Sequence, residues 1–176
     1  GGTPPQLVPL AAGWNLVGWS GATSLADATV SIAGQFSSMF TWDASNQKFR
    51  LFNASALPFL NTLTELTLGD GVWLRVSDPS GATWEQSAFN AARTVALLAG
   101  FNLVMWTGPD GTAVTDAIAG FESSVDAVFA WDAAGQRFLS FRPSALPFLN
   151  DLELLNAGDG VWLSMSAAAT WDQPAR

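Results

Sequence analysis

The side chains best suited to chemistry in this sequence are acids that occur twice, in matching positions. Asp43 is matched by Asp132, and Asp70 is matched by Asp159. A glycosidase uses two carboxylates that flank the bond to be cut, about 5 to 9.5 Å apart. Each of these aspartates instead lies in a turn-like run, where Asp is favoured because its side chain hydrogen-bonds the nearby backbone. We therefore predict that they are turn residues.

The first of these turns also offers oxygen atoms to a cation. Asp43, Ser45 and Asn46 supply a carboxylate, a hydroxyl and an amide within four residues. The segment lacks the dense carboxylate spacing of a dedicated calcium loop. Calcium is thus the weaker interpretation, and we predict no metal site and no cofactor.

The sequence contains no histidine and no cysteine. An imidazole base, a thiolate nucleophile, a disulfide and a zinc site of the usual kind are therefore excluded. The single lysine, Lys48, falls at the edge of a predicted hairpin and not in the buried setting that would let it activate a serine. We predict no catalytic residues and no enzymatic activity.

The charges narrow the choice of partners. Fifteen acidic residues face seven basic ones, which gives a net charge of −8. Binding to a phosphate backbone needs clustered Lys and Arg, so we predict no nucleic-acid binding. The longest apolar stretch, 95–106, contains Gly100 and Asn102 and is shorter than the ~20 residues of a membrane span. We predict no membrane span.

Tryptophan is the most abundant residue that could form a contact surface, with nine copies and no tyrosine. Exposed indoles offer flat apolar faces on which a sugar or a protein partner can stack. The candidates for an interface or a glycan-stacking surface are Trp19, Trp73, Arg75, Trp106 and Trp162. The alternative is that these indoles pack inside the protein, since aromatic residues dominate burial in small domains.

The chain is a tandem duplication. The segment 13–19 recurs as 100–106, and the run Ser-Ala-Leu-Pro-Phe-Leu-Asn at 55–61 returns unchanged at 144–150. Self-similarity on this scale indicates two copies of one structural unit. We predict domains at 1–90 and 91–176.

Each copy reads as short strands separated by turns. In the first copy, 7–10 and 14–19 predict a hairpin, and helical spacing from Leu25 to Ile32 predicts a helix with its N-cap at Thr23. In the second copy Thr112 takes the N-cap position. The invariant asparagine of the first strand, Asn15 or Asn102, is expected to satisfy neighbouring backbone groups.

The second half of each copy predicts another hairpin and a last pair of strands. Segments 39–42 and 48–52 should pair, with Asn46 or Gly135 in the left-handed conformation. Pro58 and Pro147 predict short helical turns. The sum is a mainly β (α+β) protein: two pseudo-symmetric small β-barrel or sandwich lobes, each with five or six strands and one short helix.

Three motifs carry a resemblance to a known module: Gly-Trp-Asn-Leu-Val at 13–17, Trp42-Asp43, and Gly-Asp-Gly-Val-Trp at 69–73. They resemble a recurring β-rich module of bacterial and archaeal secreted proteins, which begins with a "GWNL[IV]" strand and closes with a "GxG[YV]W" strand. The resemblance covers nearly all of each copy. It implies an extracellular or cell-surface location and brings no catalytic motif.

These observations favour a non-catalytic structural protein that assembles with copies of itself into a filament, sheath or surface layer. Charged residues make up only 12% of the chain, so much of its surface must be neutral or apolar and suited to contacts. The arm 1–10 could pair head-to-tail with a neighbouring copy. The alternative function is a carbohydrate-binding or adhesive module. The lone glycosylation sequon at Asn53 has no counterpart in the second copy and is treated as incidental.

Overall fold

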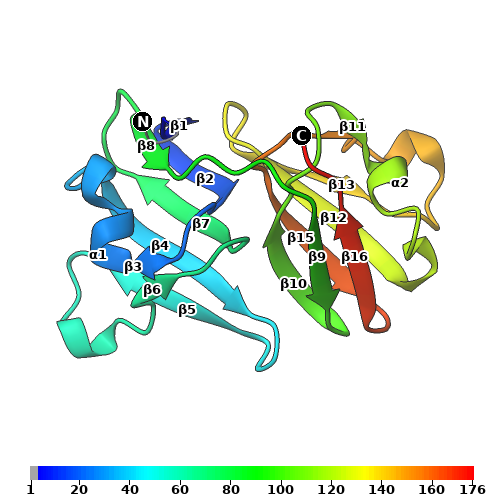
Figure 1. Cartoon of the computed structure of the whole chain (residues 1–176), viewed down its shortest axis with the longest axis horizontal. Coiled ribbons are helices and arrows are strands. Elements are labelled where there is room, and N and C mark those ends of the chain that lie inside the picture. The colour runs from blue at the N-terminus through cyan, green and yellow to red at the C-terminus, as the bar shows by residue number, and fades with distance from the viewer. Residues whose placement is uncertain (1–3) are drawn as a thin grey trace.

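The computed structural model describes residues 4–176 and consists of two similar lobes side by side (Figure 1). Lobe 1, residues 6–86, contains β1 to β8, and lobe 2, residues 93–173, contains β9 to β16. The predicted mainly β class is confirmed. The lobes are sandwich-like, and within the described residues their sheets do not close into barrels. The predicted boundary between residues 90 and 91 lies in the segment that connects β8 to β9.

The main sheet of each lobe has four antiparallel strands in the same order. In lobe 1 this order is β2 (Gly13–Gly18), β7 (Gly71–Val76), β4 (Phe36–Asp43) and β5 (Lys48–Asn53). In lobe 2 it is β10 (Gly100–Met105), β15 (Gly160–Met165), β12 (Val125–Asp132) and β13 (Arg137–Phe141).

Two-stranded sheets and short helices complete each lobe. The pairs in lobe 1 are β1 (Gln6–Leu10) with β8 (Ala82–Gln86), and β3 (Thr23–Ser24) with β6 (Glu65–Leu66). Those in lobe 2 are β9 (Arg93–Leu97) with β16 (Ala169–Gln173), and β11 (Thr112–Ala113) with β14 (Leu154–Leu155). The helices are α1 (Leu25–Ala28) and α2 (Val114–Ala117), with 3₁₀ turns at Val30–Ile32, Pro58–Leu60, Glu122–Ser124 and Pro147–Leu149. The helical turns predicted at the two prolines are confirmed.

The hairpin predicted from 7–10 and 14–19 is wrong. β1 pairs with β8, with Val8 opposite Trp84, while β2 pairs with β7. Adjacent apolar runs can pair with each other or with distant strands, and the local sequence does not distinguish the two. The first and last strands of each repeat therefore pair within that repeat, so each repeat forms a lobe of its own.

The predicted role of the asparagines in the first strands is confirmed. The buried side chain of Asn15 accepts a hydrogen bond from the Ala11 N–H (2.9 Å) and donates to the carbonyl oxygens of Ala11 (2.8 Å) and Gly13 (3.2 Å). Asn102 makes the matching contacts in lobe 2. The Asn15 and Asn102 amides thus supply hydrogen-bond partners for the backbone of the segment that connects the first two strands of each lobe.

The predicted helix from 25 to 32 is shorter than expected. α1 is a single turn, capped by Ser24 and not by Thr23, with the Ser24 hydroxyl accepting from the Asp27 N–H. The Ala28 carbonyl, which a longer helix would pair with the amide of Ile32, instead accepts the indole N–H of Trp84 (2.7 Å). In lobe 2 the N-cap position of α2 is Ala113 and not Thr112, and the cap has no side-chain hydrogen bond; Trp171 donates to Ala117 in the same way as Trp84 does to Ala28 (2.7 Å). A buried indole thus ends each helix.

The hairpin predicted from 39–42 and 48–52 is confirmed as β4 and β5. The left-handed residue is Gln47 (φ 49°), one position later than the predicted Asn46, and in lobe 2 it is Gln136 (φ 49°) and not Gly135. Asn46 donates its backbone N–H to Asp43 (3.1 Å) and thereby closes the turn. The unusual backbone at the glutamines directs their side chains toward the other lobe.

Each lobe has its own core, centred on a pair of stacked tryptophans. Trp19 stacks on Trp84 with ring centroids 5.0 Å apart, and Trp106 stacks on Trp171 at 5.4 Å. Leu74 and Val72 of the main sheet are fully buried beside the first pair. Among the described residues, no helix combines the length and the apolar character needed to cross a lipid bilayer.

Candidate functional site

The two lobes meet along an aromatic seam to which both main sheets contribute in the same way. These side chains occupy alternate positions on the strands and so share one face of each sheet. The seam consists of Trp14, Phe40, Trp42, Phe49 and Trp73 in lobe 1, and the matching Phe101, Phe129, Trp131, Phe138 and Trp162 in lobe 2.

Two glutamines bind the backbone across the seam. The amide oxygen of Gln136 accepts from the Trp14 N–H (2.9 Å), and its NH₂ group donates to the Trp14 carbonyl (3.0 Å). Gln47 makes the same pair of bonds with Phe101, at 2.8 and 3.0 Å. Neither glutamine is among the predicted site residues; the signal in the sequence is a glutamine at the same place in both hairpin loops.

Indole N–H groups reinforce the same two points. Trp131 donates to the Trp14 carbonyl (2.8 Å), and Trp42 donates to the Phe101 carbonyl (2.8 Å). Each lobe therefore hydrogen-bonds to the backbone of the other lobe's edge strand, β2 or β10, through one glutamine and one tryptophan. This arrangement satisfies polar atoms within a largely apolar contact.

The Gly-Asp-Gly turns, residues 69–71 and 158–160, bring the backbones of the two lobes into direct contact. The Gly18 N–H donates to the Gly158 carbonyl (2.7 Å), and the Met105 N–H donates to the Gly69 carbonyl (2.8 Å). The sequence predicted tight turns here, and the structure adds a role at the interface between the lobes. A side chain at the second glycine of either turn would collide with the other lobe.

Adding a methyl group at these turns is expected to destabilise the protein. A Cβ at Gly160 would lie 3.0 Å from the Val17 nitrogen, and one at Gly71 would lie 3.0 Å from the Val104 nitrogen. Because backbone atoms cannot move aside easily, Gly71→Ala and Gly160→Ala should each lower the free energy of unfolding by about 1–3 kcal/mol. Urea unfolding measures this, with Gly120→Ala as the control, since its Cβ would meet no atom within 4 Å. Equal stabilities of Gly160→Ala and Gly120→Ala would contradict the described contact.

The matching tryptophans Trp73 and Trp162 differ in how their ring faces are covered. Trp73 lies between two nearly parallel rings, Trp14 (5.0 Å, 10°) and Phe138 (5.6 Å, 11°). Trp162 meets Phe49 and Phe101 nearly at right angles, at 85° and 89°. Its faces therefore lack the parallel cover that Trp73 has.

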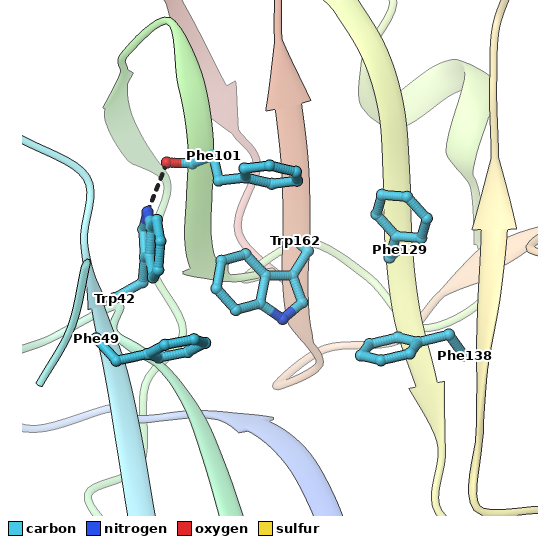
Figure 2. Close-up of a pocket in the computed structure, with 6 residues that line it drawn as sticks. All are labelled: Trp42, Phe49, Phe101, Phe129, Phe138 and Trp162. Carbon is cyan, nitrogen blue, oxygen red and sulfur yellow. Dashed lines mark hydrogen bonds between the residues drawn. The ribbon is translucent and has the colours of Figure 1, made fainter. Parts of the chain in front are cut away.

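A groove of about 380 Å³ opens beside Trp162, and we call it the seam groove (Figure 2). Two of its residues come from lobe 1 and four from lobe 2, so it exists only where the lobes meet. All of its lining residues are aromatic: Trp42, Phe49, Phe101, Phe129, Phe138 and Trp162.

The structure separates the residues that the sequence grouped as an interface or glycan surface. Trp19 and Trp106, which are 4% and 1% exposed, belong to the lobe cores and offer no surface to a partner, so their selection is corrected. Trp73 and Trp162 are half-buried in the seam, and Arg75 is an exposed residue of β7. The alternation of a strand identifies a shared face but does not say what covers it.

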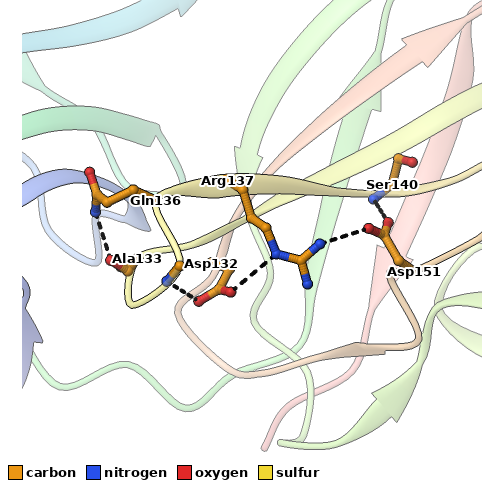
Figure 3. Close-up of polar contacts among 7 residues, drawn as sticks. Asp132, Ala133, Gln136, Arg137, Ser140 and Asp151 are labelled. Carbon is orange, nitrogen blue, oxygen red and sulfur yellow. Dashed lines mark hydrogen bonds and ion pairs between the residues drawn. The ribbon is translucent and has the colours of Figure 1, made fainter.

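The duplicated acids act in turns, as predicted. Asp132 accepts from the Gly135 N–H (3.0 Å) and pairs with Arg137 (3.6 Å), which also reaches Asp151 (3.4 Å; Figure 3). Asp43 is held similarly, and hydrogen bonds from Asn46 lower its pKa. Their oxygens are therefore engaged in local structure.

The acids of the Gly-Asp-Gly turns are more buried. Asp70 accepts from the Thr67 N–H (2.9 Å), and Asp159 accepts from the Asn156 N–H (2.8 Å). Burial raises the pKa of both carboxyl groups, that of Asp159 to about 6. Arg93 opposes the rise in the pKa of Asp70.

Substitutions between the repeats contribute to this difference. Hydrogen bonds from Thr67 and the charge of Arg50 also lower the pKa of Asp70, and Leu139 stands in lobe 2 where Arg50 stands in lobe 1. Arg93 pairs with Gln173 as Gln6 pairs with Gln86, so the neutral Gln6 occupies the position in lobe 1 that corresponds to Arg93. The carboxylate of Asp110 further raises the pKa of Asp159.

In the part of the chain that the structure describes, no three acidic side chains gather as metal ligands would. Comparison of the chain with protein families, with curated proteins and with solved structures finds no match.

Proposed function

We propose that this chain is a non-catalytic structural module of an extracellular assembly, and that it joins to copies of itself through two identical apolar loops. These end loops are residues 55–61 and 144–150, which have the same sequence. They lie at opposite ends of the molecule's long axis (Figure 1). The exposure of their large apolar side chains is the observation that carries the proposal.

The tips of the end loops are among the most exposed apolar side chains of the protein. Phe59 is 78% exposed and Phe148 is 80% exposed, and the neighbouring leucines, Leu57, Leu60, Leu146 and Leu149, are also exposed. Burying apolar surface is favourable by about 25 cal/mol per Å². A patch of this kind at each end is typical of a contact surface.

The fold of the loops does not require these side chains. Asn61 closes its loop by accepting from the Asn53 N–H (2.9 Å), and Asn150 does the same for Arg142 (2.9 Å). Pro58 begins the 3₁₀ turn. The phenylalanine and leucine side chains point to solvent in both repeats and yet are the same residue types. Contact with a partner explains this better than packing.

Free strand edges and the N-terminal arm contribute less to the proposal. The outer edge of β5 is covered by the loop that follows, since the Leu51 N–H donates to Thr62 Oγ1 (3.0 Å). In lobe 2, Ser140 is paired with Asp151 in the same way. The strand within the predicted arm, β1, pairs with β8 of its own lobe, and residues 1–3 of the arm lie outside the described residues.

A molecule with a contact surface at each end can assemble into an open-ended polymer. When one end loop is covered by a neighbour, the other remains available for the next copy, so the contact does not close on itself. The net charge of −8 opposes indiscriminate association elsewhere on the surface. This arrangement supports the proposal of a filament, sheath or surface layer.

Replacing the exposed phenylalanines tests the proposal. We expect the wild type to form polymers at micromolar concentration, Phe59→Ser and Phe148→Ser each to stop at monomers or dimers because one end is blocked, and the double variant to be monomeric. The substitutions remove exposed side chains and should leave stability within about 0.5 kcal/mol. Val30→Ser, at an exposed valine outside the loops, is the matched control and should polymerise.

Sedimentation velocity and electron microscopy give the outcome. A mixture of the two single variants tells how the ends meet: dimers that form only in the mixture indicate that one loop binds the other type of loop. A wild-type chain that stays monomeric at all concentrations, or a double variant that polymerises normally, would contradict the proposal.

The geometry does not favour the alternative, a carbohydrate-binding function. Two neighbouring rings, those of Trp14 and Phe138, already stack on Trp73. The groove beside Trp162 has an entirely aromatic lining, and sugar hydroxyl groups buried there would lack partners.

A further inference from the structure

We infer that the seam groove beside Trp162 is a binding site for an uncharged molecule with a flat aromatic ring. The groove continues the contact between the lobes, and each of its lining residues has a counterpart in the other repeat. The repeat itself shows what kind of group fits there, because the corresponding place in lobe 1 is filled.

The filling group in lobe 1 is the indole of Trp14. It lies parallel to Trp73 and also contacts Phe40, with ring centroids 6.1 Å apart. The residue that matches Trp14 in lobe 2 is the smaller Phe101, which stands at 89° to Trp162. The face of Trp162 is thus left without the parallel ring that covers Trp73.

The lining of the groove selects for an uncharged aromatic ligand. Its six side chains are all aromatic, and the indole N–H of Trp42 is already bonded to the Phe101 carbonyl. A polar ligand would lose its water and gain few hydrogen bonds, which is unfavourable. Flat rings gain from offset stacking and edge contacts with such walls. The volume of about 380 Å³ falls in the range of small-molecule sites.

A cation is the main competing ligand, because aromatic cages bind quaternary ammonium groups. The charges around this groove disfavour one. Arg142 already lies over the Phe129 ring, 5.5 Å from its centre. A bound cation would be repelled by this guanidinium group, so a neutral ring is the better match.

Exchanging the residues of the two repeats provides the test. Indole is the probe, since it is the ring that fills the matching place, and binding is followed by calorimetry on the full chain. We expect one site in the wild type. Phe101→Trp should fill the groove from within and weaken indole binding by about tenfold or more. Trp14→Phe should open the matching groove in lobe 1 and add a second site.

The experiment is run on the Phe59→Ser/Phe148→Ser double variant as well, so that its result does not depend on assembly. Both groove variants place at one repeat the residue that the other repeat already accommodates, and near-ultraviolet circular dichroism checks their folds. Equal indole binding by wild type and Phe101→Trp, or no binding by the wild type, overturns the inference. Tighter binding of tetramethylammonium than of indole would assign a cation site instead. Indole binding that appears only in the double variant would mean that an end loop of another copy occupies the groove, which also overturns it.

Discussion

Replacing Trp171 by alanine is expected to lower the free energy of unfolding by about 3–5 kcal/mol, because a large aromatic side chain leaves a cavity that the core cannot close. Trp171 is 1% exposed and packs against Trp106 and Phe121. Its indole also donates to the Ala117 carbonyl at the end of α2 (2.7 Å). The substitution removes both the packing and the group that ends the helix.

Trp171→Phe separates these two contributions. The phenyl ring retains much of the packing but cannot donate to Ala117, so the loss should be smaller, about 1–3 kcal/mol for an unpaired buried carbonyl. The internal repeat provides a second test, since Trp84 donates to Ala28 in lobe 1 in the same way (2.7 Å). Trp84→Ala and Trp84→Phe should therefore lower the free energy of unfolding by about as much as Trp171→Ala and Trp171→Phe, respectively.

Urea unfolding followed by tryptophan fluorescence and circular dichroism measures the effect. A loss below about 1 kcal/mol for Trp171→Ala, the typical value of an average substitution, would contradict the described core. Phe148→Ala, at an 80% exposed position, is the control and should be nearly neutral in dilute solution.

Lowering the pH from about 7.5 to about 5 is expected to stabilise the protein by about 1–1.5 kcal/mol through Asp159, roughly half of the full effect of the shift in its pKa. Burial raises the pKa of this carboxyl to about 6, while in the unfolded chain it keeps its ordinary value of 3.8. Between these two values the folded state binds a proton that the unfolded state does not. The free energy of unfolding therefore falls as the pH rises through this window, and the stabilisation is complete below the unfolded value.

Two other carboxyl groups also make stability depend on pH. Asp43 acts at lower pH, and Asp70 acts in the same direction as Asp159. The lowered pKa of Asp43 gives stability that is present above its unfolded value and lost as the pH falls below it. Burial also raises the pKa of Asp70, with Arg93 opposing the rise. The strongest pH dependence between 3.8 and about 6 should thus come from Asp159.

Two substitutions isolate this group. Asp159→Asn keeps an oxygen for the Asn156 N–H but cannot titrate, so the pH dependence across the window should become clearly weaker, with the part due to Asp70 remaining. Gln6→Arg places in lobe 1 the charge that Arg93 supplies in lobe 2, and it should lower the pKa of Asp159 and weaken the pH dependence. Exposed Asp126→Asn is the control. An unchanged pH profile in Asp159→Asn would show that another group is responsible.

The sequence by itself determined the features that depend on short stretches of chain. The duplication, the mainly β class and the β4–β5 hairpin follow from repeated motifs and alternation. The turn roles of the aspartates and the backbone contacts of Asn15 also follow, because these side chains act on residues within a few positions. Local hydrogen-bonding chemistry is visible in sequence.

Only the tertiary structure decided which distant groups meet. Helix α1 ends early because Trp84, far along the chain, takes the Ala28 carbonyl. Trp19, just after β2, and Trp73, within β7, are the same residue type in apolar runs, yet one is in a core and the other in the seam, since this depends on what packs against each. The exchange of Trp14 for Phe101 reads as conservative, but in the folded protein it removes a parallel ring from the face of the matching tryptophan. Long-range packing selects among placements that local propensity leaves equal.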